Sequence, residues 1–161
     1  MEIKAFNYKG SPGFDIADFR MYEREIAQKP WMLNVTYLVF GYDMAEDGTV
    51  TIKKVWQKKV WEMSRPMKSG KSKTIWPINL QIKQGTVHKM RPAKWYGKQT
   101  AFSIYDCLED FLSAMEETMY KNKDTRDDAP DWLQKVLDNY EKHYKVRLQI
   151  PRWNDIASKY V

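Results

Sequence analysis

The residue types best suited to chemistry are the carboxylates of Asp43 and Asp47 and, further along the chain, Gln81 and Lys83, which stand two residues apart. Metal-assisted cleavage of a phosphodiester bond needs oxygen ligands that hold a divalent cation and a positive charge near the reacting phosphate. The two carboxylates and the Gln81 carbonyl oxygen could bind Mg²⁺, while Lys83 could stabilise the charge that develops in the transition state. The alternative is that the aspartates are ordinary turn residues and that Gln81 and Lys83 belong to an exposed strand face.

The charge of the chain is concentrated in its middle. The sequence has 27 Lys and Arg and 21 Asp and Glu, yet residues 51–98 contain thirteen of the basic residues and one acid, Glu62, with Trp and Tyr side chains interspersed. Cations gain affinity for nucleic acid by releasing counterions from phosphates, and flat rings can stack on unpaired bases. The segment therefore predicts DNA or RNA binding, with a solvated lysine-rich surface as the alternative. The predicted contacts are Lys53, Lys58, Lys59, Arg65, Lys68, Lys71, Lys73, Trp76, His88, Lys89, Arg91, Lys94 and Trp95.

The spacing of apolar residues predicts the elements that must position these side chains. Helical spacing is found in three segments, the first capped by Asp15 and the last opened by Pro130. These helices are predicted at 15–28, 103–120 and 130–144. Alternating apolar residues predict strands, with a hairpin turn at Asp47-Gly48 and a bulge near Lys53-Lys54. The strands are predicted at 33–41, 51–63, 78–83, 86–90 and 146–150, with a helix as the alternative for 51–63.

This order predicts an α+β fold in one domain over residues 1–161. The expected architecture is an antiparallel β-meander of four to five strands, packed by an N-terminal helix and two C-terminal helices. Residues 64–74 are polar, basic and contain Pro and Gly, which predicts a mobile loop. If the strand over 51–63 runs antiparallel to the strand over 78–83, the loop that carries Asp43 and Asp47 approaches Gln81 and Lys83.

This order of elements, with Gln81-x-Lys83 on the third strand, resembles the restriction-endonuclease-like PD-(D/E)xK nucleases, some of which carry Gln in place of the acid before the lysine. The resemblance covers residues 15–150 and implies a Mg²⁺-dependent DNA endonuclease, in which Asp47 or Asp43 binds the metal. Glu23 of the first helix would be an accessory acid. No Pro-Asp dipeptide stands shortly before Gln81, so the site is either assembled differently or absent. A non-catalytic DNA- or RNA-binding module, which needs no cofactor, is the alternative.

Other classes of function have weaker signals. The sequence contains no P-loop, G-x-G-x-x-G, H-E-x-x-H or G-x-S-x-G pattern, and its single cysteine, Cys107, cannot form an internal disulfide. His88 and His143 leave open metal-free RNA cleavage by an acid and a base. No apolar run is long enough to cross a bilayer and the first residues lack a signal-peptide pattern, so we expect a cytoplasmic protein that binds no membrane. A homodimer is one option for its assembly.

Overall fold

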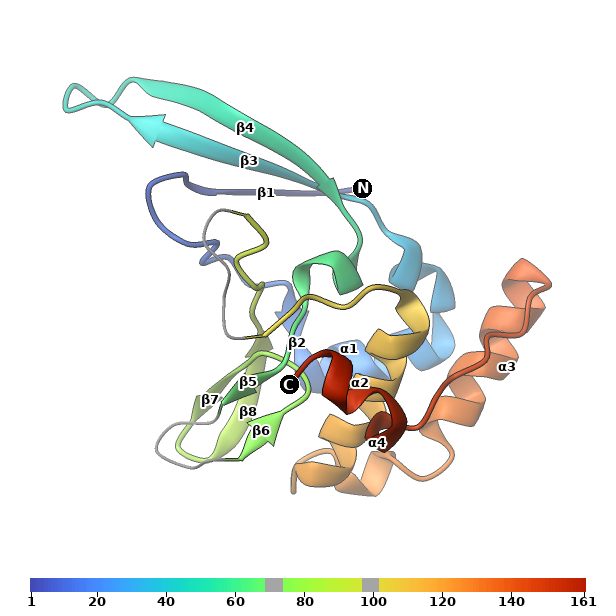
Figure 1. The fold of residues 1–161 in the computed structure, drawn as a ribbon. Helices are drawn as coiled ribbons and strands as arrows, with labels where there is room; N and C mark the ends of the chain where they lie inside the picture. The colour runs from blue at the N-terminus through green and yellow to red at the C-terminus, as the bar shows by residue number, and fades with distance from the viewer. Residues whose placement is uncertain (69–73, 97–101) are drawn as a thin grey trace.

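The computed structural model of the protein describes residues 1–68, 74–96 and 102–161. Figure 1 shows a curved three-stranded sheet on one side of the molecule, smaller sheets below it, and the helices grouped beside them. This mixture of separate helices and mainly antiparallel strands confirms the predicted α+β class. Within the described residues, no helix is long and apolar enough to cross a membrane.

The largest sheet has the strand order β1-β3-β4. Its strands are β1 (Glu2–Asn7), β3 (Tyr37–Met44) and β4 (Val50–Lys58). The β3–β4 hairpin is antiparallel, as predicted. Gly41 lies opposite Lys54 and Tyr42 lies opposite Ile52, so that Lys53 is the extra residue of a bulge. The predicted strand and bulge are confirmed, although the strand ends at Lys58 and a 3-10 helix, η2 (Val60–Met63), follows it.

Strand β1 was missed by the sequence-based prediction. It runs parallel to β3, with Glu2 opposite Tyr37 and Asn7 opposite Tyr42. The connection between these parallel strands contains α1 (Phe19–Gln28) and a 3-10 helix, η1 (Pro30–Asn34). A parallel pair needs such a crossover, so the first sheet is not a simple meander.

The remaining strands form two smaller sheets rather than continuing the predicted meander. One has the order β2-β8-β7 and the other is the hairpin β5-β6. The hairpin β7–β8 turns at Gln84 and Gly85, whose φ angles of 52° and 76° suit the tight turn that joins two antiparallel strands. Within the loop predicted at 64–74, Met67 and Lys68 form strand β5. Strand β6 begins directly after the predicted loop, and residues 69–73 lie outside the described residues. The bounds are β2 (Ala17–Asp18), β5 (Met67–Lys68), β6 (Ile75–Trp76), β7 (Leu80–Lys83) and β8 (Thr86–Met90).

The helices are close to those predicted, with local differences at their ends. Helix α1 begins at Phe19 because Asp18 Oδ1 accepts a hydrogen bond from the Met21 N–H (3.0 Å), whereas Asp15 instead pairs with Arg91. The strand predicted at 146–150 does not form, and this segment is irregular in the structure. The other helices are α2 (Leu108–Lys121), α3 (Trp132–Tyr144) and the short α4 (Trp153–Ile156), with 3-10 helices η3 (Arg126–Asp128) and η4 (Ala157–Lys159).

One hydrophobic core joins the first sheet to the helices. The inner face of β3 contributes Val39, α1 contributes Phe19 and Ile26, and α2 contributes Phe111 and Met115, and none of these five side chains is exposed. Burial of such large apolar side chains supplies most of the stability of a chain without disulfides. The core therefore fixes β1 and α1 relative to one another through β3.

Candidate active site

The two aspartates predicted to bind metal lie on the β3–β4 hairpin. Asp43 is near the end of β3, where its carboxylate forms an ion pair with Lys9 (3.2 Å). Asp47 lies in the exposed turn and accepts a hydrogen bond from the Thr49 N–H (2.9 Å), which lowers the pKa of the Asp47 carboxyl. Asp47 therefore has a structural role in the turn.

Gln81 and Lys83 lie in a different sheet from these carboxylates. Both belong to β7, whose described strand partner is β8 and not β4. Figure 1 shows the tip of the β3–β4 hairpin and β7 well apart. The predicted approach of Asp43 or Asp47 to Gln81 and Lys83 required β7 to pair with β4. In the structure η2 and the β5–β6 hairpin follow β4, and β7 pairs with β8 instead, so these residues are not brought together. A catalytic role for Gln81 and Lys83 stays a prediction.

A closer match to the acid-x-lysine pattern stands at the start of the chain, in Glu2-Ile3-Lys4. Residues two apart on a strand share a face, so Glu2 and Lys4 both lie on the face of β1 that also carries the buried Phe6. The Glu2 N–H donates a hydrogen bond to the Thr36 carbonyl (2.9 Å), which anchors the start of the β1–β3 pairing. No role was predicted for Glu2 and Lys4 from the sequence. The pattern of an acid and a lysine in an alternating apolar segment was the available signal.

Glu2 and Lys4 line a cavity of about 380 Å³ between β1 and α1. Lys89 of β8 and the carboxylates of Asp18 and Glu25 line the same cavity. Burial, together with the neighbouring Glu2 carboxylate, raises the pKa of Tyr37 to about 12. The cavity thus combines carboxylates with two lysines. A lysine can contact a phosphate oxygen, and a carboxylate can orient or deprotonate a water molecule.

The described residues do not complete a divalent-metal site. Among residues 1–68, 74–96 and 102–161, no group of three or more His, Cys, Asp or Glu converges as metal ligands. Asp18 already caps α1, which leaves Glu2 as the carboxylate nearest to Lys4 along the strand. Glu23, the accessory acid implied by the resemblance, and Glu62, the single acid of residues 51–98, do not line this cavity. Glu62 accepts a hydrogen bond from the Lys59 N–H (2.7 Å), and Glu23 is buried in α1.

Two of the predicted nucleic-acid contacts have structural partners instead. The Lys59 ammonium donates to the Asn34 carbonyl (2.6 Å) and to the Thr36 hydroxyl (2.9 Å), and so ties β4 to the start of β3. Arg91 pairs with Asp15 (2.7 Å). These cations hold the fold together, and a substitution at either position would disturb the structure as well as any ligand.

Other predicted contacts are partly buried. Arg65 is half-buried, and burial lowers the pKa of its guanidinium. Lys58 lies over the Trp95 ring (5.9 Å to its centroid), and Trp95 itself packs edge-on against Trp56 (5.4 Å). Trp76 is also packed against the core. These rings contribute to the fold, so their availability for stacking on bases is limited.

The remaining predicted contacts differ in exposure. Lys53 on the β4 bulge and Lys68 on β5 are exposed, whereas His88 and Lys89 on β8 are half-buried. Lys94 lies over the Tyr96 ring (5.3 Å to its centroid). Lys71 and Lys73 lie outside the described residues. Lys54, beside the bulge, is exposed as well and extends the cationic edge of β4.

Comparison with known proteins agrees with this architecture. The family model of the NgoBV restriction endonuclease matches residues 1–160. The type II restriction enzyme NlaIV of Neisseria lactamica is 53% identical over 161 residues, which cover 99% of this chain and 64% of that protein. The type II restriction enzyme NgoBV of Neisseria gonorrhoeae is 44% identical over 84 residues, which cover 52% of this chain and 44% of that protein.

A solved structure of the NlaIV restriction endonuclease superposes with a TM-score of 0.92 at 53% identity, covering 99% of this chain and 63% of that one. The chain therefore spans less than two thirds of the length of these relatives. The match over nearly the whole of the chain confirms the resemblance to restriction-type nucleases inferred from its sequence. This chain belongs to the NgoBV restriction endonuclease family.

Proposed function

We propose that the protein is a DNA endonuclease of the restriction type and that Glu2 and Lys4 act in its active site. The observation that carries the proposal is the placement of Glu2 and Lys4 on one face of β1, in a cavity that also contains Lys89. The names of the relatives support DNA as the substrate, since both are type II restriction enzymes. The basic β4 edge would contact the phosphate backbone.

The residues of this cavity suit hydrolysis of a phosphodiester bond. A water oxygen would attack phosphorus while one P–O ester bond breaks, and negative charge would increase on the phosphate oxygens. Lys4, with Lys89 near it, would stabilise that charge. The Glu2 carboxylate would orient the water or accept its proton. Each role follows from the charge of the side chain and from its place on the cavity wall.

Mg²⁺ is the cofactor that we propose, because hard cations prefer carboxylate oxygens and Glu2 supplies one. The described residues give only part of a ligand set. Asp43, Asp47, Gln81 and Lys83 remain a rival proposal for the site. We also propose a homodimer, since two antiparallel strands of a duplex need two cuts, and a cytoplasmic location.

The proposed activity is tested by incubating the purified protein with supercoiled plasmid DNA and Mg²⁺. We expect nicked and linear products, which EDTA suppresses. DNA binding without any cleavage, in either Mg²⁺ or Mn²⁺, would contradict the proposal and would favour the non-catalytic binding module. A single-stranded RNA of matched length, left intact under the same conditions, would support DNA as the substrate.

The exposed lysines of β4 give a separate prediction about binding. The double substitution Lys53→Glu and Lys54→Glu should weaken DNA binding about tenfold or more and reduce the magnitude of the salt slope, d log K/d log [salt], by about 2, since each phosphate contact contributes about 0.9 for duplex DNA. Fluorescence anisotropy with a labelled duplex at several salt concentrations measures both quantities.

The control makes the same charge change on another element. Lys135→Glu with Lys142→Glu alters two exposed lysines of α3. This variant is expected to keep most of the affinity and the original salt slope. Equal losses in both double variants would mean that net charge, and not the β4 edge, determines DNA binding.

A further inference from the structure

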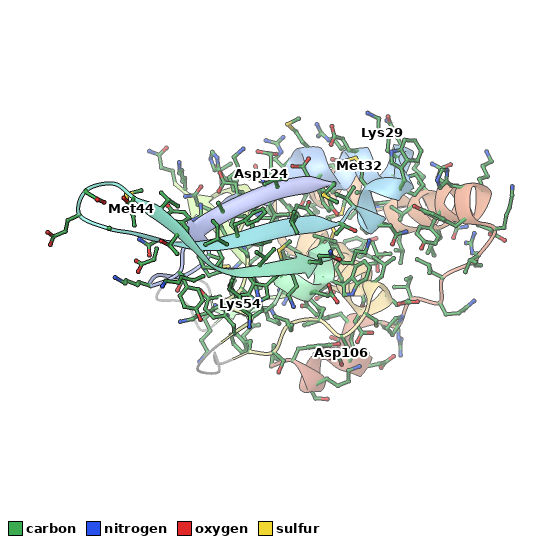
Figure 2. All side chains as sticks on the ribbon, turned by 90° about the horizontal axis from the view of Figure 1, so that it is seen from above. Lys29, Met32, Met44, Lys54, Asp106 and Asp124 are labelled. Atoms are coloured by element: carbon green, nitrogen blue, oxygen red, sulfur yellow. The ribbon has the colours of Figure 1, made fainter. Side chains whose placement is uncertain are left out.

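The first sheet has an apolar outer face that no described element covers. The strand register places Ile3 beside Leu38, and Ala5 beside Phe40 and Val55, in rows across β1, β3 and β4. Ile3 is 67% exposed, and Val55 is 47% exposed. Figure 2 looks down on this face and shows the three strands in front of the helices. We define the outer face by Ile3, Ala5, Leu38, Phe40, Tyr42, Ile52 and Val55.

Such a face is unusual for a protein in water. A sheet normally buries one face and exposes a polar one, and contiguous apolar patches of this kind mark interaction sites. Along each strand, the side chains of the outer face alternate with those of the inner face, where Phe6 and Val39 are buried. Asn7 and Gln57 also lie on the outer face, at two ends of its rows, but the side chains between them are apolar, which is the pattern of a sheet face covered by another element.

The β1 edge of the same sheet is also unpaired among the described strands. Within the described residues, β1 has β3 as its single strand partner. The amides of Glu2 and Tyr8 donate to carbonyls of the β3 side, so the amides of Ile3 and Ala5, at odd positions between them, point away from β3. Strand β1 thus presents free backbone donors and acceptors to an added strand.

The longer relatives carry polypeptide outside the matched region. NlaIV shares the fold of this chain with a TM-score of 0.92, but more than a third of its length lies outside the match. We propose that a polypeptide segment of the kind that NlaIV carries outside the matched region docks here, with one strand paired to the free edge of β1 and apolar side chains on the outer face. This inference does not rest on the proposed nuclease activity.

Hydrogen–deuterium exchange of individual amides tests the proposal. In the chain alone, we expect the Ile3 and Ala5 amides to exchange fast and the Lys4 and Phe6 amides slowly. In a second protein, the unmatched part of NlaIV is joined to this chain through a Gly/Ser linker, in the order in which NlaIV carries the two parts. There we expect protection of Ile3 and Ala5 to rise at least tenfold.

Two variants of the joined protein separate the edge from the face. Ala5→Pro removes an amide that points to the free edge, which a strand edge tolerates, and Ile3→Asp puts a charge on the outer face. Both should abolish the gain in protection. The readout is the Ile3 amide in the proline variant, because proline has no amide hydrogen, and both amides in Ile3→Asp. The control Val146→Asp, at a site that is 54% exposed after α3, should not. Circular dichroism checks that each variant stays folded.

Three results would overturn the proposal. The first is slow exchange of the Ile3 and Ala5 amides in the chain alone, at concentrations at which the chain is monomeric. The second is no added protection of these amides in the joined protein. The third is self-association of the chain that Ile3→Asp abolishes, while the joined segment leaves both amides unprotected. This last result would assign the face to a second copy of the chain. Each readout is independent of DNA cleavage, so the proposed function can fail while this inference holds.

Discussion

Lys4→Ala is expected to reduce the rate of DNA cleavage about a hundredfold or more while leaving most of the DNA affinity. A positioned charge that acts on the transition state contributes about 10²–10³ to the rate, whereas one cation among many contributes little to binding. Lys4 is half-buried on the cavity wall, where the charge is less screened by water than on the surface. Single-turnover cleavage of a plasmid, with anisotropy for binding, measures both effects.

Lys9→Ala provides the matched control. Lys9 follows β1, is largely exposed and pairs with Asp43 on the hairpin, so its loss removes the same charge outside the cavity. Its cleavage rate is expected to stay within a few-fold of the parent. A Lys4→Ala protein that cleaves at the parental rate would remove Lys4 from the active site, whatever the activity of the Lys9 variant.

The second large effect concerns the stability of the fold and its dependence on pH. Glu23 is a buried carboxyl of α1, 1% exposed, that lies beside Asp128 and Arg24. Burial and the hydrogen bond with Asp128 raise its pKa from about 4.5 to about 8. The same hydrogen bond, together with Arg24, lowers the pKa of Asp128. At pH values below 8 but above the pKa of Asp128, Glu23 is therefore protonated and Asp128 is ionised in the folded protein.

The sign of the effect follows from proton binding. Between pH 4.5 and 8 the folded protein keeps the Glu23 proton that the unfolded chain has lost, so the free energy of unfolding falls as the pH rises through this range. The contribution is complete below pH 4.5 and is lost above pH 8, with a size on the order of a few kcal/mol. Glu23→Gln mimics the protonated group and should remove most of this dependence.

Urea unfolding at pH 5, 6.5 and 8, followed by circular dichroism, measures how the free energy of unfolding of each protein depends on pH. The parent should lose stability across this series, and the Glu23→Gln protein should lose less. Glu25→Gln makes the same chemical change two residues further along α1, at a half-buried position, and should follow the parent. Parallel curves for the parent and Glu23→Gln would show that Glu23 is ionised in the folded protein throughout.

Local patterns predicted the elements whose signals lie within a few residues. The β4 bulge at Lys53, the hairpin at Asp47-Gly48 and the helix after Pro130 all follow from turn residues and apolar spacing. The segment 146–150 alternates in the same way but pairs with no strand in the part of the chain that the structure describes, and it is irregular. Alternation predicts a strand only when a partner is present to receive its hydrogen bonds.

Pairings between distant segments could not be read in the same way. The parallel pairing of β1 with β3 depends on a crossover through α1, which no local pattern specifies. The pattern of a polar residue and a lysine two apart occurs both at Gln81-x-Lys83 and at Glu2-x-Lys4. The pattern alone does not choose between the two positions. Glu2 and Lys4 line a cavity together with Lys89 of β8, whereas Gln81 and Lys83 lie on the neighbouring strand β7 and do not line that cavity.

The location of the active site is tested most directly by comparing Lys4→Ala with Lys83→Ala in one cleavage assay. Both substitutions remove a lysine two residues after a potential metal ligand, and the plasmid, the Mg²⁺ concentration and the protein concentration are the same. We expect Lys4→Ala to lose cleavage and Lys83→Ala to keep most of it. Loss of cleavage in Lys83→Ala, with parental cleavage in Lys4→Ala, would contradict the account and would place the site at β7.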